Sequence, residues 1–533
     1  MRRWNGWGEE TVNYNMTEEA ASFLAERMGP GRVPEDVSRE ALSARVPPSR
    51  LQEHPLIQTD AWGRVLHSTG QSQADWIQIR GGTVPAFPDA VAYPQDGGEV
   101  RALLDYARRA GAYVIPYGGG TSVVGHLAVP LQERPVLSVD MSRMNALLHL
   151  DETSGLATFQ AGVRGPDLEA ALAARGYTLG HYPQSFEYST LGGWVAARSA
   201  GQYSFRYGKI ERLFAGGVLE TPQSTLVLPA VPATAAGPDL REMVLGSEGR
   251  LGILTEAVVR VSPLPEKEVI KAAFFPDPST AYAAVRELAQ SGVPLGMLRL
   301  SLSEETETTL RLSSPNRALA LLERWLAWRG VGEGKCLLLY GGIGRERSVN
   351  FVLDEAWSII KKHHGQGVGT PIGKEWRQHR FRLPYIRNDL WAMGYGADTL
   401  ETAVNWNKVP ETVEGIQTAL RGALDKEKET VHVFTHLSHF YPQGASIYTS
   451  YVFRLGAAPE DSMGRWQRLK RAASEVIVRA GGTISHQHGV GVDHLPYLAA
   501  EKGTQGMAMI RSVCRAVDPE GMMNPGKLWA DGV

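Results

Sequence analysis

A run of three glycines and two hydroxyl residues, at positions 118–122, limits the local backbone more than any other part of the chain. A phosphate group needs several backbone N–H groups converging on it, and side chains would block that approach. The run is not a P-loop, because no lysine follows, and it lacks the G-x-G-x-x-G dinucleotide pattern. Glycine triplets also occur in plain turns, so the run alone indicates a phosphate-binding loop without establishing one.

Two further stretches, residues 184–201 and 246–255, also combine glycines with hydroxyl residues. The second of them leads into an apolar run at 257–261, which predicts a strand. Each stretch alone could be a turn, but three within one block favour a single extended ligand contacted by several loops.

Strand-like and helical patterns alternate around these loops. Apolar spacing predicts helices at 100–109 and 166–175 and strands at 113–116 and 156–161. Prolines at 263 and 265 mark the end of this block. Within the block, a flexible surface loop is expected at 230–238. A more helical region is expected to about residue 456 and a helical segment from about 461. The alternation predicts an α+β or α/β fold.

The three loops resemble the FAD-binding segments of the superfamily that includes vanillyl-alcohol oxidase and p-cresol methylhydroxylase (PCMH). The resemblance implies an α+β fold with a two-subdomain PCMH-type FAD-binding domain. It implies noncovalent FAD, because the first loop lacks the histidine to which some relatives attach the flavin; His126, just after it, is interpreted as loop packing. The resemblance assigns contacts with FAD to these residues: Pro116, Tyr117, Gly118, Gly119, Gly120, Thr121, Ser122, Gln184, Ser185, Phe186, Glu187, Tyr188, Ser189, Thr190, Ala197, Arg198, Ser199, Ala200, Gly246, Ser247, Glu248, Gly249, Arg250, Leu251 and Gly252.

Within this superfamily the chain resembles the alkyldihydroxyacetonephosphate synthase family. The motifs that carry the resemblance lie at residues 3–8, 180–183, 385–388, 444–448 and 485–491. The resemblance implies exchange of the acyl chain of acyl-dihydroxyacetone phosphate for a fatty alcohol, in ether-lipid synthesis and without net redox change.

Four residues receive roles from this resemblance. Tyr448 matches the family's acid/base tyrosine, His486 and His488 are expected around it, and Arg387 matches the arginine that holds the substrate phosphate. One departure is Gln487, which stands where the family has the middle of three histidines. An amide cannot carry a proton at neutral pH, so Gln487 cannot relay a proton as the family's histidine could.

Plainer interpretations stay open beside these roles. Tyr448 lies in an alternating run that fits an ordinary strand, and Arg387 could form a salt bridge with Asp389 or Glu401. The alternative activity is FAD-linked oxidation of a D-2-hydroxy acid such as lactate or glycolate, which the C-terminal residues 518–528 fit equally well. No metal is expected, because the candidate ligands His432, His436 and His439 suit a strand or loop as well as a helix, and Gln487 is a weak ligand beside carboxylates.

Composition sets the remaining limits. A chain of 533 residues is too long for one core, and a net charge of −2 argues against a nucleic-acid partner. The two cysteines, Cys336 and Cys514, and the lack of a signal peptide or apolar span predict a cytoplasmic location.

A small-molecule or lipid-phosphate substrate is expected, with peripheral membrane contact and a homodimer left open. The expected division is an N-terminal helical or irregular segment (1–84), the FAD-binding domain (85–265), an α+β cap (266–460) and a C-terminal helical segment completing the flavin site (461–533).

Overall fold

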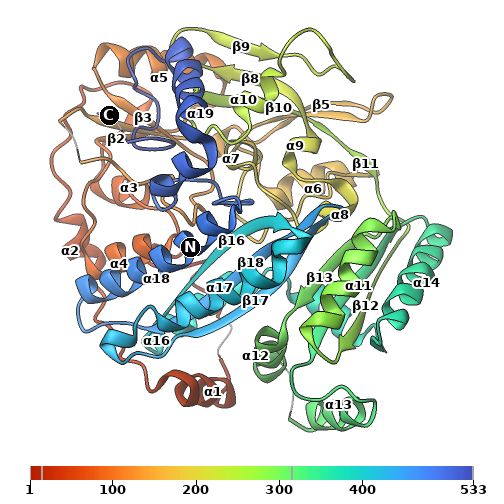
Figure 1. Cartoon of the computed structure of the whole chain (residues 1–533). Coiled ribbons are helices and arrows are strands. Elements are labelled where there is room, and N and C mark those ends of the chain that lie inside the picture. The colour runs from red at the N-terminus through yellow and green to blue at the C-terminus, as the bar shows by residue number, and fades with distance from the viewer. Residues whose placement is uncertain (1, 14–15, 132, 314–315, 531–533) are drawn as a thin grey trace.

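The computed structural model describes residues 2–13, 16–131, 133–313 and 316–530. Three larger sheets and one two-stranded sheet organise the described residues (Figure 1), which is a mixed α+β architecture. The first sheet has the strand order β1 (Ile57–Gln58), β2 (Ala90–Ala92), β4 (Val136–Asp140) and β3 (Tyr113–Tyr117). Strands β2, β4 and β3 are parallel, while β1 pairs antiparallel with β2.

Helix α5 (Gly97–Arg109) connects β2 to β3 and begins at an aspartate cap, Asp96. Its apolar face, which the spacing predicted at Val100, Leu103, Leu104 and Ala107, is fully buried. Each such side chain contributes roughly 1.5–3 kcal/mol on burial. The parallel strand that follows, β3, therefore ends at a fixed place, and the glycine run starts there.

The second sheet is antiparallel, in the order β5 (Leu147–Asp151), β6 (Leu156–Gln160), β10 (Ile253–Arg260), β8 (Phe214–Glu220) and β9 (Thr225–Leu228). A two-stranded ladder of β7 (Tyr177–Thr178) and β11 (Ser262–Pro263) lies beside it. The helices between the strands of the second sheet are α6 (Gly165–Ala173), α7 (Leu191–Ala197), α8 (Ser204–Tyr207), α9 (Ile210–Leu213) and α10 (Leu240–Val244). The 3-10 turn η1 (Met141–Arg143) precedes the first strand of this sheet. These two sheets correspond to the two subdomains that the resemblance to PCMH-type proteins predicts.

The third sheet is the largest and is antiparallel throughout. Its order is β15 (Gln366–Gly369), β12 (Lys267–Phe275), β14 (Cys336–Gly344), β13 (Met297–Ser301), β17 (His432–Tyr441), β18 (Gly444–Arg454) and β16 (Tyr395–Asn405). The region contains more helix than the preceding block, as expected, but the sequence pattern did not locate its seven strands. Strands such as β14 are buried on both faces, and a continuous apolar run of that kind cannot be distinguished from a buried helix by periodicity.

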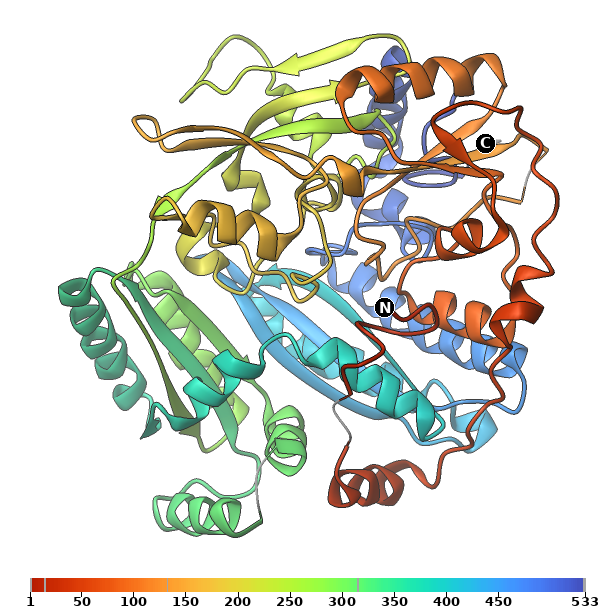
Figure 2. The same cartoon turned by 180° about the vertical axis from the view of Figure 1, so that it is seen from behind.

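Helices cover both faces of this sheet. One face carries α11 (Pro278–Gln290), α14 (Glu346–Lys362) and α17 (Val409–Gly422), as Figure 1 shows. Figure 2 shows the helices of the other side, α15 (Pro371–His379) and α16 (Leu383–Ala392). The remaining elements of the region are α12 (Ser303–Ser313), α13 (Asn316–Trp328), η2 (Trp406–Lys408) and η3 (Asp425–Glu427).

The two ends of the chain pack onto these units. The N-terminal segment contains α1 (Glu18–Met28), α2 (Arg39–Ser43), α3 (Ala61–Leu66) and α4 (Gln73–Gly81), and the C-terminal segment contains α18 (Pro459–Ala480) and α19 (Leu495–Val517). Because β1 pairs with β2, the first sheet extends across the expected boundary at residue 84. Met523 forms a parallel bridge with Val114 of β3, so the C-terminal segment also reaches that sheet. No helix in the described ranges combines the length and apolarity needed to cross a bilayer.

Candidate active site

A cavity of about 960 Å³ lies between the first two sheets and the third sheet. All three glycine-rich stretches line it: residues 116–123 of the first, parts of 184–200 of the second, and Ser247, Glu248, Gly249 and Gly252 of the third. Tyr448, Arg387 and His488 line the same cavity. Side chains far apart in the sequence are thus brought to one enclosed space.

Some residues assigned to FAD lie elsewhere and pack the loops instead. Phe186 stacks on Phe381 with ring centroids 5.2 Å apart, and the hydroxyls of Tyr188 and Tyr385 are 3.0 Å apart. Arg198 forms ion pairs with glutamates, and Arg250 donates to the backbone of Met523. In the described part of the chain the following assigned residues do not line the cavity: Phe186, Glu187, Tyr188, Arg198, Gly246, Arg250 and Leu251.

Two features of the structure require glycine at positions in the 118–120 run. A Cβ on Gly119 would lie 1.9 Å from the carbonyl oxygen of Tyr188, so the second loop touches the backbone of the first. Gly120 has φ +66°, a left-handed conformation that glycine adopts at least cost. The sequence suggested that Gly119 lacks a side chain so that a phosphate can approach. The structure shows a nearer reason, which is the close contact between the first and second loops.

The first loop nevertheless fits the pyrophosphate of FAD. The backbone N–H groups of Gly119, Gly120 and Thr121 donate to no group within the described residues, and these residues line the cavity. Successive unpaired amides after a strand make an anion-binding concavity. His126, just beyond, lies 2.9 Å from Ser122 Oγ and 3.1 Å from Glu248 Oε1, which agrees with its interpretation as a packing residue.

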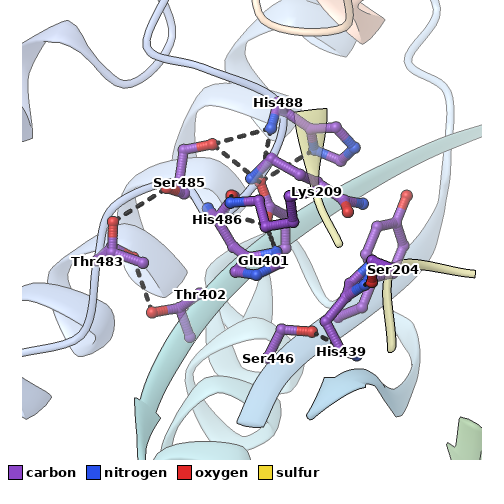
Figure 3. A network of polar contacts seen from close by, with 12 residues as sticks. Ser204, Lys209, Glu401, Thr402, His439, Ser446, Thr483, Ser485, His486 and His488 are labelled. Carbon is purple, nitrogen blue, oxygen red and sulfur yellow. Dashed lines mark hydrogen bonds and ion pairs between the residues drawn. The ribbon is translucent and has the colours of Figure 1, made fainter. Parts of the chain in front are cut away.

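Two buried carboxylates hold the loop that carries the histidine motif, residues 485–491, and Figure 3 shows the first of them, Glu401. Glu401 on β16 accepts hydrogen bonds from Ser485 Oγ at 2.8 Å and from the backbone N–H groups of His486, Gln487 and His488 at 2.9–3.0 Å. Glu248 accepts from the N–H groups at positions 490 and 491. Hydrogen bonds to charged groups are worth about 1.5–3 kcal/mol each, so both carboxylates fix the loop strongly.

Tyr448 is on β18 and faces the cavity. Its ring stacks on His436 at 4.7 Å and contacts His488 edge-on at 5.7 Å, and its hydroxyl donates to Thr399 Oγ1 at 3.2 Å. Burial raises the pKa of Tyr448 to about 12. The phenol therefore stays protonated at neutral pH and is available as a hydrogen-bond and proton donor.

The structure separates the two histidines expected around Tyr448. His486 turns the other way: its Nε2 is 2.6 Å from the Tyr441 hydroxyl, and its ring stacks on His439 at 4.9 Å. In the described ranges its side chain is not among those that line the cavity or pack on the Tyr448 ring, so its catalytic role stays a prediction. Gln487 does line the cavity, and its side-chain oxygen is buried with no hydrogen-bond partner among the described residues.

Arg387 lies under the indole of Trp76, with its guanidinium carbon 4.3 Å from the ring centroid. It donates to Gln71 O at 2.7 Å and to Gln73 Oε1 at 3.2 Å, which uses two of its five N–H donors. The anticipated salt bridge with Asp389 or Glu401 is not found within the described residues. Burial lowers the pKa of Arg387 to about 10, so it remains a cation able to hold an anion.

The three histidines of β17 have separate partners. His432 Nε2 is 3.0 Å from Thr308 Oγ1, His436 Nδ1 is 2.9 Å from Glu305 Oε2, and His439 Nδ1 is 2.7 Å from Ser204 Oγ. Among the residues with described placement, no three potential metal ligands converge.

Sequence reasoning missed Glu305 and Arg299, and it weighed His436 only as a metal ligand. Arg299 Nη2 lies 2.5 Å from Glu305 Oε1, and all three residues line the cavity. No local motif marks them, because they come from three separate elements, β13, α12 and β17. Only the pairing of β13 with β17 brings them together.

Comparisons with known proteins agree with this geometry. Residues 88–227 match the family described as FAD binding domain, and residues 264–528 match FAD linked oxidases, C-terminal domain. Alkyldihydroxyacetonephosphate synthase of Dictyostelium discoideum is 32% identical over 479 residues, covering 89% of this chain and 78% of that protein. A solved structure of alkyldihydroxyacetonephosphate synthase is 27% identical with a TM-score of 0.85, covering 99% of both chains.

A solved structure of p-cresol methylhydroxylase is 13% identical with a TM-score of 0.71, covering 98% of this chain and 99% of the other, which shows the shared fold. The FAD-binding match confirms the expected cofactor, and the match to the synthases confirms the narrower resemblance. The chain is thus an FAD-dependent enzyme of the PCMH-type superfamily and belongs to the alkyldihydroxyacetonephosphate synthase family.

Proposed function

We propose that the enzyme exchanges the acyl chain of an acyl-dihydroxyacetone phosphate for a long-chain alcohol. The observation that carries the proposal is that one cavity contains the FAD loops, Tyr448, Arg387 and an apolar wall. A lipid phosphate needs all of these in one place, because its headgroup is anionic and its chain is apolar. The wall consists of Met297, Leu298, Leu337, Leu339, Ile372 and Trp376.

The residues would divide the work by chemistry. Arg387 has N–H donors left for a phosphate, and a guanidinium holds phosphate in a bidentate manner. Tyr448, protonated at neutral pH, would donate to a substrate oxygen. FAD, when bound along the glycine loops, supplies the electrophilic ring system that the exchange requires.

One experiment tests the proposal against the hydroxy-acid alternative. The purified enzyme is incubated with palmitoyl-dihydroxyacetone phosphate and hexadecanol, and alkyl product and released palmitate are measured while the flavin spectrum is followed. Exchange without flavin bleaching supports the proposal. Bleaching by anaerobic D-lactate or glycolate, with no alkyl product, would replace it with the oxidase activity.

We also propose a cytoplasmic location and peripheral contact with a lipid surface. Both cysteines are free and buried, as in a reducing compartment. On α13, Leu321, Trp325 and Trp328 are exposed by 66%, 38% and 78%, and the Arg329 guanidinium lies over the Trp328 ring. Aromatic side chains beside arginine suit a membrane interface, where this substrate resides. Co-sedimentation with anionic vesicles, compared between the native enzyme and Trp328→Ser, tests the contact.

A further inference from the structure

Four polar side chains form one row across the third sheet. Ser301 of β13 is directly opposite His436 of β17, His436 is opposite Tyr448 of β18, and Tyr448 is opposite Glu401 of β16. Residues directly opposite one another in neighbouring strands project from the same face. The row therefore points toward the cavity, which Ser301, His436 and Tyr448 line, while Glu401 at its end holds the 485–488 loop.

Within this row His436 has a fixed proton arrangement. Two charged groups lie against Nδ1 of His436: Glu305 Oε2 at 2.9 Å, which only accepts hydrogen bonds, and Arg299 Nη2 at 3.1 Å, which only donates them. The shorter contact places a proton on Nδ1, because Arg299 Nη2 has a closer acceptor in Glu305 Oε1 at 2.5 Å. Glu305 is 4% exposed and is itself held by Arg299 and by Ser301 Oγ at 3.1 Å. The other ring nitrogen, Nε2, has no hydrogen-bond partner in the described portion of the chain, and the residue lines the cavity.

We propose that His436 is a catalytic proton acceptor for the hydroxyl group of the entering alcohol, with Glu305 as its positioning residue. The inference rests on the proposed function. The alcohol O–H bond breaks, and its electron pair stays on the alcohol oxygen. Over the exchange that oxygen bonds to the substrate carbon that carried the acyl chain, the bond from this carbon to the acyl oxygen breaks, and the fatty acid leaves as a carboxylate. The alcohol proton forms an N–H bond at Nε2. The Glu305 carboxylate balances the resulting imidazolium, as a buried carboxylate does for a catalytic histidine.

The neighbouring groups are less suited to this role. Tyr448 keeps its proton, since burial raises its pKa to about 12. His488 Nδ1 lies 3.5 Å from Glu401 Oε1, and that carboxylate already accepts from Ser485 and three backbone N–H groups. His436 thus has the better-placed carboxylate.

The charged and titratable groups around His436 set its proton affinity. Arg299 faces it from β13, Glu305 from α12, Tyr448 from β18, and His439 lies on β17 itself. Burial lowers the pKa of His436, Arg299 lowers it further and Glu305 opposes both. At neutral pH the ring is consequently neutral and able to accept a proton.

The test compares native enzyme, His436→Asn, Glu305→Gln and the control His363→Asn in the palmitoyl-dihydroxyacetone phosphate and hexadecanol assay. His363 forms a similar pair, 2.7 Å from Glu287 Oε2, on the outer helices α14 and α11. We expect His436→Asn to lose about 10²–10⁴-fold in kcat, the usual contribution of a general base. FAD content and the unfolding midpoint should change little, imidazole should restore part of the rate, and His363→Asn should match native enzyme.

Glu305→Gln separates positioning from bulk structure through the pH profile. The rate should rise with pH as His436 becomes neutral, with the rise lying below pH 6.5. Without the carboxylate the pKa of His436 falls, so the rise should move to lower pH while kcat drops and KM stays the same. If Glu305→Gln lowers kcat but leaves the pH profile where it was, or if the kcat of His436→Asn stays within threefold of native, the inference about His436 is overturned while the proposed function stands. Native enzyme without any exchange overturns the proposed function and the inference with it.

Discussion

The rings of Tyr448 and His436 stack 4.7 Å apart with their planes 19° from parallel. The contact follows from strand register, because the two residues are directly opposite on β18 and β17. Closely facing aromatic pairs contribute about 0.5–1.5 kcal/mol beyond area burial. The stack therefore depends on the tyrosine ring, and the hydroxyl, which donates to Thr399 Oγ1, takes no part in it.

Replacing Tyr448 by phenylalanine should lower turnover by about 10²–10⁴-fold while FAD binding and stability change little. The ring and its stack remain, and only the proton donor is removed. Thr399→Val is the matched control, since it removes the hydroxyl's partner, worth roughly 1 kcal/mol, and keeps the phenol. Steady-state kinetics of both variants decide the matter: equal, small losses would make Tyr448 a structural residue.

Gly119→Ala should abolish FAD binding, because the new Cβ would lie 1.9 Å from Tyr188 O and push the first two loops apart. Gly332→Ala is the control, since no atom lies within 4 Å of its Cβ position. Flavin absorbance after gel filtration measures occupancy. Acid precipitation of native enzyme should leave FAD in the supernatant, as expected for noncovalent attachment. A fully yellow Gly119→Ala protein would contradict the placement of the flavin.

Arg387→Lys should raise KM for a phosphorylated substrate about 10–100-fold, because an ammonium cannot replace a bidentate fork worth 1.5–3 kcal/mol. FAD content should be unchanged. The comparison is made with the dephosphorylated analogue, whose binding should be equal in both proteins. If both substrates weaken equally, Arg387 supports the site through Gln71 and Trp76 instead.

Glu401→Gln should destabilise the protein by about 3 kcal/mol, since hydrogen bonds to a buried carboxylate are lost and an amide donor is introduced. Turnover should fall with stability because the 485–488 loop carries His488 to the cavity. Urea unfolding measures the change, with exposed Glu414→Gln on α17 as control. Identical unfolding curves for the two variants would exclude this role for Glu401.

Asp493 predicts a pH dependence of stability. Burial raises its pKa to about 7, Lys470 opposes the rise, and Asp398 and Asp75 add to it. An unfolded aspartate has a pKa of about 3.9, so between pH 4 and 7 the folded state binds more protons and stability falls as pH rises. Asp493→Asn stays neutral and should remove this loss, on the order of a few kcal/mol.

The measurement for Asp493 is the free energy of unfolding of native and Asp493→Asn enzyme at pH 5 and pH 8. The difference between the two proteins should shift in favour of the variant at pH 8. The exposed Asp425→Asn serves as the control. A difference that is the same at both pH values would show that Asp493 does not change its protonation on unfolding.

Local patterns were enough for the elements that build the flavin loops. The apolar face of α5 and the strand that leads into Gly118 follow from spacing and glycine position. The third sheet was harder, because β14 is apolar on both faces. Glu305 could not be found at all, since its relation to His436 exists only once β13 and β17 pair. That part of the site depends on how distant strands pair, which local sequence propensity does not reveal.

The bridge between Met523 and Val114 has a consequence for how the chain is made. Val114 N–H donates to Met522 O at 2.9 Å, and Asn524 N–H donates to Val114 O at 2.8 Å. The strand that opens the phosphate loop thus gains its last neighbour about 400 residues after its own synthesis, a contact of very high sequence separation that slows folding. During translation this edge of the first sheet therefore stays unpaired until the C-terminal segment has been synthesised, and an unpaired strand edge makes a folding intermediate prone to aggregation.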